Sequence, residues 1–306
     1  RGVNCSPDQI IVGAGNDYLY MVLTTTMGNH HKIAFENPTY KRDYQLFYNL
    51  SYETCTVDID EQGMDVSKLE QSNADIAFVM PSHQYPLGIV MPVKRRLELL
   101  QWAEKKADRY IIEDDYDSEF RYKGKPIPAL QGYDNHEKVI YVGTFSKSIA
   151  PAIRVSYIVL PRILLQQYWK KSGFLNSTVS KVDQLILQKF IEEGYYERHL
   201  NKTRALYKGR HDRLLTSLKC LRTQFDISGE NAGVHLLLHC KNKMSETELI
   251  QRAADKDVKV YGLSEYYVKQ QVQKPATILL GYANMQEESI VEAVRLLKEA
   301  WIEKDA

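Results

Sequence analysis

The sequence has few cysteines and almost no net charge. Its four cysteines, Cys5, Cys55, Cys220 and Cys240, lie far apart and form no CxxC or metal-binding spacing. We therefore expect reduced thiols in a cytoplasmic protein, and no metal site. With 40 Lys and Arg against 39 Asp and Glu, the net charge is +1. This balance gives no support for a basic surface that binds nucleic acid or anionic membranes.

The sequence also lacks an apolar run long enough to span a membrane, and it shows no signal peptide. It opens on Arg1 rather than on methionine and runs at once into sequence typical of a folded domain. We expect the chain to be a fragment of a longer protein.

The chain instead contains an alternation of apolar strands and helical patterns, which is typical of an α/β protein. Strands are expected at 9–12, 32–35, 75–80, 109–112, 139–142 and 155–160, and later at 234–239 and 276–282. The stretch 163–218 is helical with few breakers, and a last helix is expected at about 287–301. The prediction is a large domain over 1–200 with a mainly parallel sheet, and a smaller α+β domain over 201–306.

A lysine surrounded by hydroxyl groups directly follows the strand at 139–142. Thr144, Ser146 and Lys147 come first, and Arg154 lies seven residues after the lysine. Open α/β sheets bind ligands beyond the carboxyl ends of their strands. A lysine placed there can form a Schiff base, and the hydroxyls and the arginine are donors suited to a phosphate. Taken alone, the segment also fits a solvated surface lysine, which is the commoner case after a strand.

Two further strands end in residues that suit a phosphate and a planar ring. The first strand breaks into Gly13-Ala14-Gly15-Asn16 before a helix, either as a phosphate cradle or as an ordinary turn that needs glycine. The second leads to Tyr40 and Arg42, where an aromatic face either stacks on a ring or simply packs.

The strands at 75–80 and 109–112 end in more polar loops. Residues 81–88 form a rigid loop with two prolines and a glycine, which carries His83 and Gln84. Residues 113–119 contain five carboxylates, among them Asp114. They could hold a metal or another cation, such as a protonated ring nitrogen, or they could form a solvated acidic loop.

Together these strand ends offer a Schiff-base lysine, a phosphate cradle with an arginine, a stacking tyrosine and a carboxylate. This set matches pyridoxal 5′-phosphate in its aldehyde, phosphate, ring face and ring nitrogen. The segments Gly13–Gly15, Pro81–Pro86, Glu113–Phe120 and Gly143–Lys147 also resemble those of the MocR/GabR family of bacterial transcription regulators. Members of that family join an N-terminal winged helix-turn-helix to a domain shaped like a fold-type I aminotransferase.

The resemblance implies a role for each candidate residue. Lys147 would form the Schiff base, Asp114 would pair with the ring nitrogen, Tyr40 would stack on the ring and Tyr116 would contact the ring hydroxyl. The phosphate would be held by Gly13, Ala14, Gly15, Asn16, Thr144, Ser146 and Arg154, and the ring region would be approached by His83 and Gln84. The resemblance also implies a homodimer, with DNA contacted only through a helix-turn-helix that is absent from this sequence.

One position departs from the family pattern. The late segment reads Gly281-Tyr282-Ala283-Asn284, with Asn284 where relatives carry an arginine that grips a carboxylate. An asparagine cannot donate a pair of charge-assisted hydrogen bonds to a carboxylate as an arginine does, although Arg42 could bind a carboxylate in another way. We therefore expect a regulator's effector-binding domain with little or no turnover, which senses pyridoxal phosphate itself or a small amino acid. The alternative is an aminotransferase of the 2-aminoadipate or aromatic type.

Overall fold

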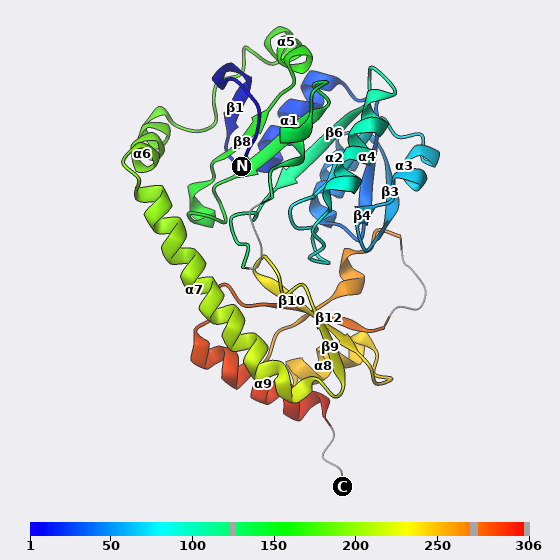
Figure 1. Cartoon of the computed structure of the whole chain (residues 1–306), viewed down its shortest axis with the longest axis vertical. Coiled ribbons are helices and arrows are strands. Elements are labelled where there is room, and N and C mark those ends of the chain that lie inside the picture. Colours follow the sequence, from blue (N-terminus) through cyan, green and yellow to red (C-terminus); the bar gives the residue numbers. More distant parts are fainter. Residues whose placement is uncertain (123–126, 270–274, 303–306) are drawn as a thin grey trace. The chain divides into compact units, whose positions relative to one another are not determined.

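The computed structural model describes residues 1–122, 127–269 and 275–302. The chain forms two compact units (Figure 1). The first comprises Arg1–Tyr85, Ile89–Glu119 and Lys125–Leu200, and the second comprises Pro86–Gly88, Phe120–Gly124 and Asn201–Ala306. Each unit has its own sheet, and each is described here by itself.

The sheet of the first unit has eight strands in the order β1-β8-β7-β6-β5-β2-β3-β4. Its strands are β1 (Ile10–Gly13), β2 (Lys32–Asn37), β3 (Glu53–Asp60), β4 (Gly63–Met64), β5 (Ile76–Val79), β6 (Tyr110–Asp115), β7 (Val139–Thr144) and β8 (Ser156–Val159). Strands β3, β2, β5, β6 and β7 run parallel, whereas β8 is antiparallel to both β7 and β1. Strand β1 therefore points the same way as β7. The expected fold class, with a mainly parallel sheet, is confirmed.

Helices cover both faces of this sheet, and the side chains of each strand alternate between them. The helices are α1 (Asn16–Met27), α2 (Lys41–Asn49), α3 (Val66–Gln71), α4 (Val93–Glu104), α5 (Arg162–Lys171) and α6 (Lys181–Glu192). Phe78 and Ile112 pack in one core with α1, α2 and α5, whereas Val79 and Ile111 pack in another with α3 and α4. Because side chains alternate along a strand, Asp114 lies on the same face as Ile112.

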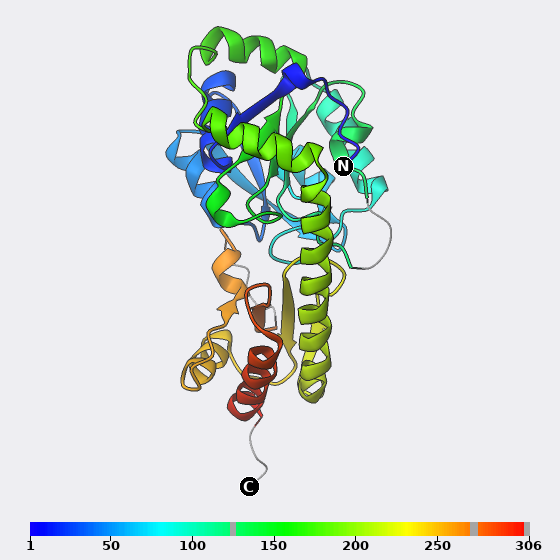
Figure 2. The same ribbon diagram turned by 90° about the vertical axis from the view of Figure 1, so that its left-hand side faces the viewer.

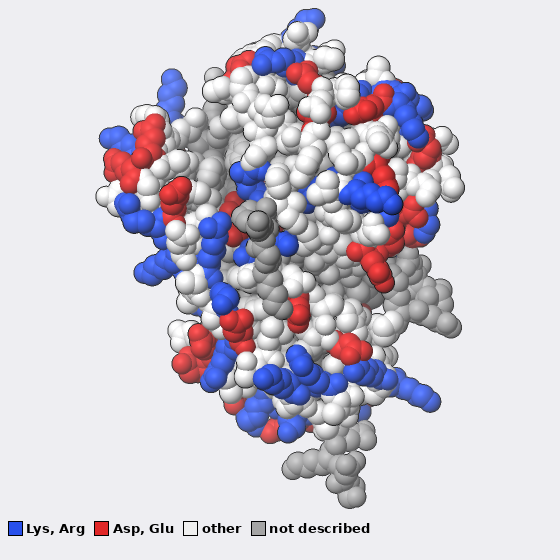
Figure 3. Space-filling view, in the orientation of Figure 1, with Lys and Arg blue, Asp and Glu red and all other residues white. Residues whose placement is uncertain are grey.

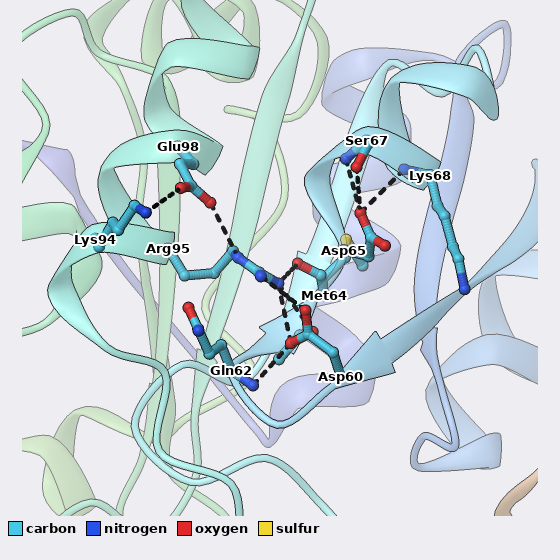
Figure 4. A network of polar contacts seen from close by, with 10 residues as sticks. Asp60, Gln62, Met64, Asp65, Ser67, Lys68, Lys94, Arg95 and Glu98 are labelled. Carbon is cyan, nitrogen blue, oxygen red and sulfur yellow. Dashed lines mark hydrogen bonds and ion pairs between the residues drawn. The ribbon is translucent and has the colours of Figure 1, made fainter.

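A buried arginine joins the edge hairpin to helix α4 (Figure 4). The guanidinium of Arg95 donates to both carboxylate oxygens of Asp60, at 2.8 and 3.2 Å, and to the carbonyl of Met64 at 2.6 Å. It also donates to Glu98 at 3.1 Å. Nearby, the Asp65 side chain caps α3 by accepting the N–H of Ser67. The β3–β4 hairpin is thus held by charge-assisted hydrogen bonds rather than by apolar packing alone.

The second unit is a four-stranded antiparallel sheet with helices. Its elements are β9 (Phe225–Ser228), β10 (His235–Cys240), α8 (Glu246–Ala254), β11 (Tyr261–Gly262), β12 (Thr277–Gly281) and α9 (Glu287–Trp301), with the strands ordered β11-β12-β10-β9. Figure 2 shows α8 and α9, orange and red, beside one another, and both contribute to a single core with β10 and β12. Helix α7 (Tyr195–Ser217) begins in the first unit and ends in the second.

Two surface properties bear on function. On the face shown in Figure 3, basic and acidic side chains are interspersed over both units, in keeping with the net charge of +1. None of the helices in the described ranges is long and apolar enough to cross a membrane.

Candidate functional site

A pocket of about 270 Å³ lies in the first unit, where β1, β6 and β7 end and β8 begins. It is formed mostly by the polar residues that follow these strands. The lining residues are Gly15, Asn16, Asp17, Tyr40, Arg42, Asp43, Met80, Tyr85, Asp114, Tyr116, Thr144, Ser146, Lys147, Arg154 and Ser156. The antiparallel β8 matters here because it places Arg154, which precedes its first residue, at the same edge of the sheet as Lys147, which follows β7.

Lys147 lies in the turn after β7 and is exposed on the pocket side. The turn is anchored by hydrogen bonds to Thr144, whose Oγ1 accepts the Ser146 N–H at 3.1 Å and the Ser156 hydroxyl at 2.9 Å. The turn therefore presents an amine next to a fixed set of hydroxyl groups, which is the arrangement that a Schiff-base site requires.

The N-terminus of α1 and Arg154 form a positive end of the pocket. Gly15 is the residue before α1 and has φ +94°. A Cβ at this position would collide with Arg154 Nη2 and lie 2.8 Å from its Cζ, so only glycine allows the guanidinium this close. Unpaired N–H groups and the helix dipole favour an anion here.

Only two of the four residues of the predicted phosphate cradle line the pocket. Gly15 and Asn16 line the pocket, whereas Gly13 and Ala14 do not. The Ala14 N–H donates to Thr178 Oγ1 at 2.9 Å, and a Cβ on Gly13 would lie 2.7 Å from the Tyr18 ring. Gly13 thus serves the packing of α1 on β1.

Asp114 is a buried carboxylate of the pocket. It is 5% exposed, and it accepts the Tyr20 hydroxyl at 3.2 Å and the Asn16 side-chain amide at 3.4 Å. Burial raises the pKa of Asp114, the Tyr20 hydrogen bond opposes this shift, and the charges of Asp115 and Asp117 add to it. A cationic partner in the pocket would offset the cost of keeping this carboxylate ionised.

Aromatic residues form the remaining wall. Tyr40, at the start of α2, meets Tyr85 edge to face, with ring centroids 5.8 Å apart. The Tyr116 hydroxyl lies 2.9 Å from Nδ1 of His83, which in turn lies 2.8 Å from Asp117. His83 is therefore placed behind Tyr116 rather than in the lining.

Gln84 is also buried outside the lining, where its amide donates to the Pro38 carbonyl at 2.9 Å. Arg42 lines the pocket and pairs with Asp17 at 2.8 Å. Asn284 belongs to the second unit, just after β12, and its proposed role stays a prediction.

The carboxylates of segment 113–119 are not a solvated acidic loop, because Glu113 to Asp115 lie inside β6 and are buried. Glu113 accepts the N–H groups of Leu130 and Gln131, both at 2.8 Å. Asp115 accepts the Arg1 guanidinium and the Tyr141 hydroxyl, both at 2.6 Å. Among the described residues, no group of three or more His, Cys, Asp or Glu side chains is arranged to hold a metal ion.

Sequence reasoning missed five lining residues: Asp17, Asp43, Met80, Tyr85 and Ser156. Two of them carry a detectable signal. Asp43 lies three residues after Tyr40, which is one helical turn, and Asp17 directly follows the predicted cradle. Met80 and Ser156 carry no sequence signal that separates them from core residues.

The residues present fit pyridoxal 5′-phosphate. The cradle around Gly15 and Arg154 suits a phosphate, the Lys147 amine suits an aldehyde, and buried Asp114 suits a protonated ring nitrogen. This fold and pocket define an aminotransferase-like protein of fold type I.

The chain belongs to the aminotransferase class I and II family, whose sequence model matches residues 1–297. Membership implies pyridoxal 5′-phosphate as the cofactor, as the sequence predicted. Among solved structures, the kynurenine aminotransferase of Pyrococcus horikoshii is similar, with a TM-score of 0.82 and 26% identity over 95% of this chain and 74% of that one.

Two curated relatives are transcription regulators, which confirms the resemblance found in the sequence. The uncharacterized HTH-type transcriptional regulator YdeL of Bacillus subtilis is 39% identical over 98% of this chain and 65% of its own length. The probable rhizopine catabolism regulatory protein MocR of Rhizobium meliloti is 31% identical over 99% of this chain and 61% of its own length. The chain thus spans less than two thirds of either relative.

Proposed function

We propose that the chain is the effector-binding and dimerisation domain of a MocR/GabR-type regulator, with pyridoxal phosphate attached at Lys147. The observation that carries this proposal is the convergence of Lys147, Asp114, Tyr40 and Arg154 on one pocket. When bound, the cofactor supplies a reactive carbonyl and an electron-withdrawing ring.

The chain's own residues would hold and orient that group. Lys147 provides the amine, and Thr144, Ser146, Arg154 and the α1 N-terminus bind the phosphate. Asp114 keeps a proton at the ring nitrogen, because an adjacent buried carboxylate stabilises the cation. Tyr40 covers one ring face, and Tyr116 donates to or accepts from the ring hydroxyl.

Two observations support a regulator rather than an enzyme. The two curated relatives described above are regulators, and each has more than a third of its length outside the matched part. By the family resemblance, Asn284 stands where an arginine would bind a substrate carboxylate, and its absence would weaken binding by roughly 2–5 kcal/mol if that ion pair is desolvated. DNA would then be contacted by a separate helix-turn-helix, in the cytoplasm.

The effector in this proposal is pyridoxal phosphate itself or a small amino acid. Arg42 is the pocket cation that could take an amino-acid carboxylate. It is paired with Asp17, but the Arg42 side chain is 65% exposed and that of Asp17 is 38% exposed. Exposed pairs of this kind contribute about 0–1 kcal/mol, so a ligand carboxylate can replace Asp17 at little cost.

The proposed homodimer has a candidate surface on α6 and the segment before it. Phe174, Val182, Leu185 and Ile186 are exposed by 57 to 79% of their surface. A row of large apolar side chains at helical spacing is unusual for a surface that faces only water. We propose that a second copy of the chain covers it.

The visible absorption spectrum of the purified chain with added pyridoxal phosphate tests the function. Wild-type protein should show the band of a lysine Schiff base, and borohydride should fix the cofactor on Lys147, as mass spectrometry of the peptide would show. Lys147→Ala should abolish the adduct. An adduct of normal yield in the variant would overturn the assignment.

The family match and the similarity to a kynurenine aminotransferase favour aminotransferase activity as the second candidate. The same spectrum separates the two. A sensor's band is shifted by its amino-acid effector, or left unchanged by every amino acid if the cofactor is itself the effector. A band that an amino acid bleaches and a keto acid restores would establish the enzyme.

A further inference from the structure

Asp43 is a buried carboxyl group that none of the roles above uses. It lies in the first turn of α2, three residues after Tyr40, and it lines the same pocket as Asp114. The residue is 4% exposed. Within the part of the chain that the structure describes, its carboxyl group accepts no hydrogen bond and makes no ion pair.

An ionised carboxylate in such a place is costly, because burial removes most of its water and no hydrogen-bond donor among the described residues replaces it. Such a group takes up a proton instead of staying charged. Burial raises the pKa of Asp43, the charges of Asp114 and Asp17 raise it further, and only Arg42 opposes the shift. Arg42 is already paired with Asp17 at 2.8 Å.

The surroundings decide which of the two buried pocket carboxyls, Asp43 or Asp114, holds the proton. Asp114 accepts hydrogen bonds from Tyr20 and Asn16, which stabilise its ionised form. Asp43 accepts none. The remaining charged groups of the pocket are the cations Lys147 and Arg154, on the turn after β7 and before β8. The neighbours therefore favour an ionised Asp114 beside a neutral Asp43.

We propose that Asp43 stores a proton beside Asp114 and releases it to the ring nitrogen when pyridoxal phosphate binds. The O–H bond of Asp43 breaks and its electron pair stays on the carboxylate oxygen. The proton passes, directly or through Asp114, to the ring nitrogen, where an N–H bond forms. No other reactant is needed. Asp43 is thus a positioning residue that fixes the protonation state of the ring, and this inference rests on the proposed cofactor site.

The number of protons that the protein takes up from solvent when it binds the cofactor should therefore depend on Asp43, and this number can be measured. At a pH one unit above the pKa of the ring nitrogen in free pyridoxal phosphate, the wild-type pocket supplies the proton internally. In Asp43→Asn the proton must come from solvent. All other proton changes, at Lys147 and at the phosphate, are common to both proteins and cancel in the comparison.

The experiment is calorimetric titration of pyridoxal phosphate in buffers of different ionisation enthalpy. Asp43→Asn should take up one more proton per cofactor than the wild type, and the ratio of its Kd to the wild-type Kd should rise by about tenfold per pH unit. Asp58→Asn makes the same chemical change in a carboxylate that is paired with Lys68 outside the pocket, and it should match the wild-type proton count. Equal proton counts in Asp43→Asn and the wild type would overturn the inference.

A second measurement needs no variant. At the same pH, in wild-type protein labelled with ¹³C-aspartate, infrared difference spectra should lose the C=O band of a protonated aspartic acid when pyridoxal phosphate is added. An unchanged band would overturn the inference even if Asp43→Asn fails to fold. Failure of the wild type to bind pyridoxal phosphate at all would instead refute the proposed function on which the inference rests.

Discussion

Replacing Gly15 by alanine should weaken the binding of the cofactor phosphate and leave the Schiff-base lysine unaffected. Gly15 has φ +94° and ψ 165°, a backbone conformation that is essentially reserved for glycine. Alanine there costs about 1–3 kcal/mol in backbone strain. In addition, its Cβ would collide with Arg154 Nη2, so the guanidinium has to leave its place beside the α1 N-terminus.

The displaced arginine sets the expected loss of affinity. A hydrogen bond to a charged group contributes about 1.5–3 kcal/mol. Losing the Arg154 contact with the phosphate should therefore weaken the Kd for pyridoxal phosphate roughly 10- to 150-fold. Lys147 is untouched, so the variant should still form its Schiff base once the cofactor is saturating.

Gly229→Ala is the matched control. Gly229 also has a positive φ, +80°, but the nearest atom to its added Cβ is 3.8 Å away. Both variants should lower the thermal midpoint, and only Gly15→Ala should weaken the Kd measured by absorption titration. If Gly15→Ala binds pyridoxal phosphate as tightly as the control does, Arg154 is not part of the phosphate site.

Three further predictions follow from other parts of the molecule. Asn284→Arg should strengthen the binding of carboxylate-bearing amino acids, measured as the ligand concentration that half-shifts the cofactor band; an unchanged value would remove position 284 from the effector site. Glu36 is fully buried and burial raises its pKa to about 8, so the folded state holds a proton that the unfolded state has lost. The stabilising contribution of Glu36 is complete below about pH 4.5 and is lost as pH rises to about 8, so the free energy of unfolding should fall by up to about 1.4 kcal/mol per pH unit. Glu36→Gln should flatten this pH dependence in denaturant titrations. A dependence that persists in the variant would assign it to another group. Ile186→Glu should shift the chain towards monomer in analytical ultracentrifugation, whereas Gln188→Glu on the same helix should not; identical masses would place the dimer contact elsewhere.

The edge of the sheet that carries the site could be predicted because apolar runs end sharply in polar residues. Val139–Val142 followed by Thr144 and Lys147 is such an ending, and so is the run before Gly13. Hydrophobic periodicity and amino-acid composition identify the strands, and the carboxyl ends of parallel strands meet at one edge of the sheet. This reasoning pointed to Lys147, to Tyr40 and to the carboxylate group that contains Asp114, and the structure brings these three residues to one pocket.

The direction of β8 and the burial of the acidic segment could not be predicted. A buried strand reads the same in either direction, so nothing in 155–160 showed that Arg154 precedes an antiparallel strand. Glu113 and Asp115 look like loop residues because their partners, the Leu130 N–H and Tyr141, are distant in sequence. Five carboxylates in seven residues favour solvent unless such partners are known.

The breaks within the helical stretch 163–218 could not be predicted either. The stretch breaks into α5, α6 and α7, and a glycine with positive φ, Gly194, separates the last two. Periodicity showed helix content but not the breaks, since a single glycine is tolerated inside many helical patterns.

The antiparallel return of β8 has an evolutionary consequence. Thr144 and Ser156 are paired in register, so residues 145–155 form one closed loop that carries both Lys147 and Arg154. An insertion or deletion in this loop would change the separation between the amine and the guanidinium, whereas a substitution at an exposed position such as Ala152 would not. Relatives that keep the cofactor should therefore preserve the length of this loop more strictly than its sequence.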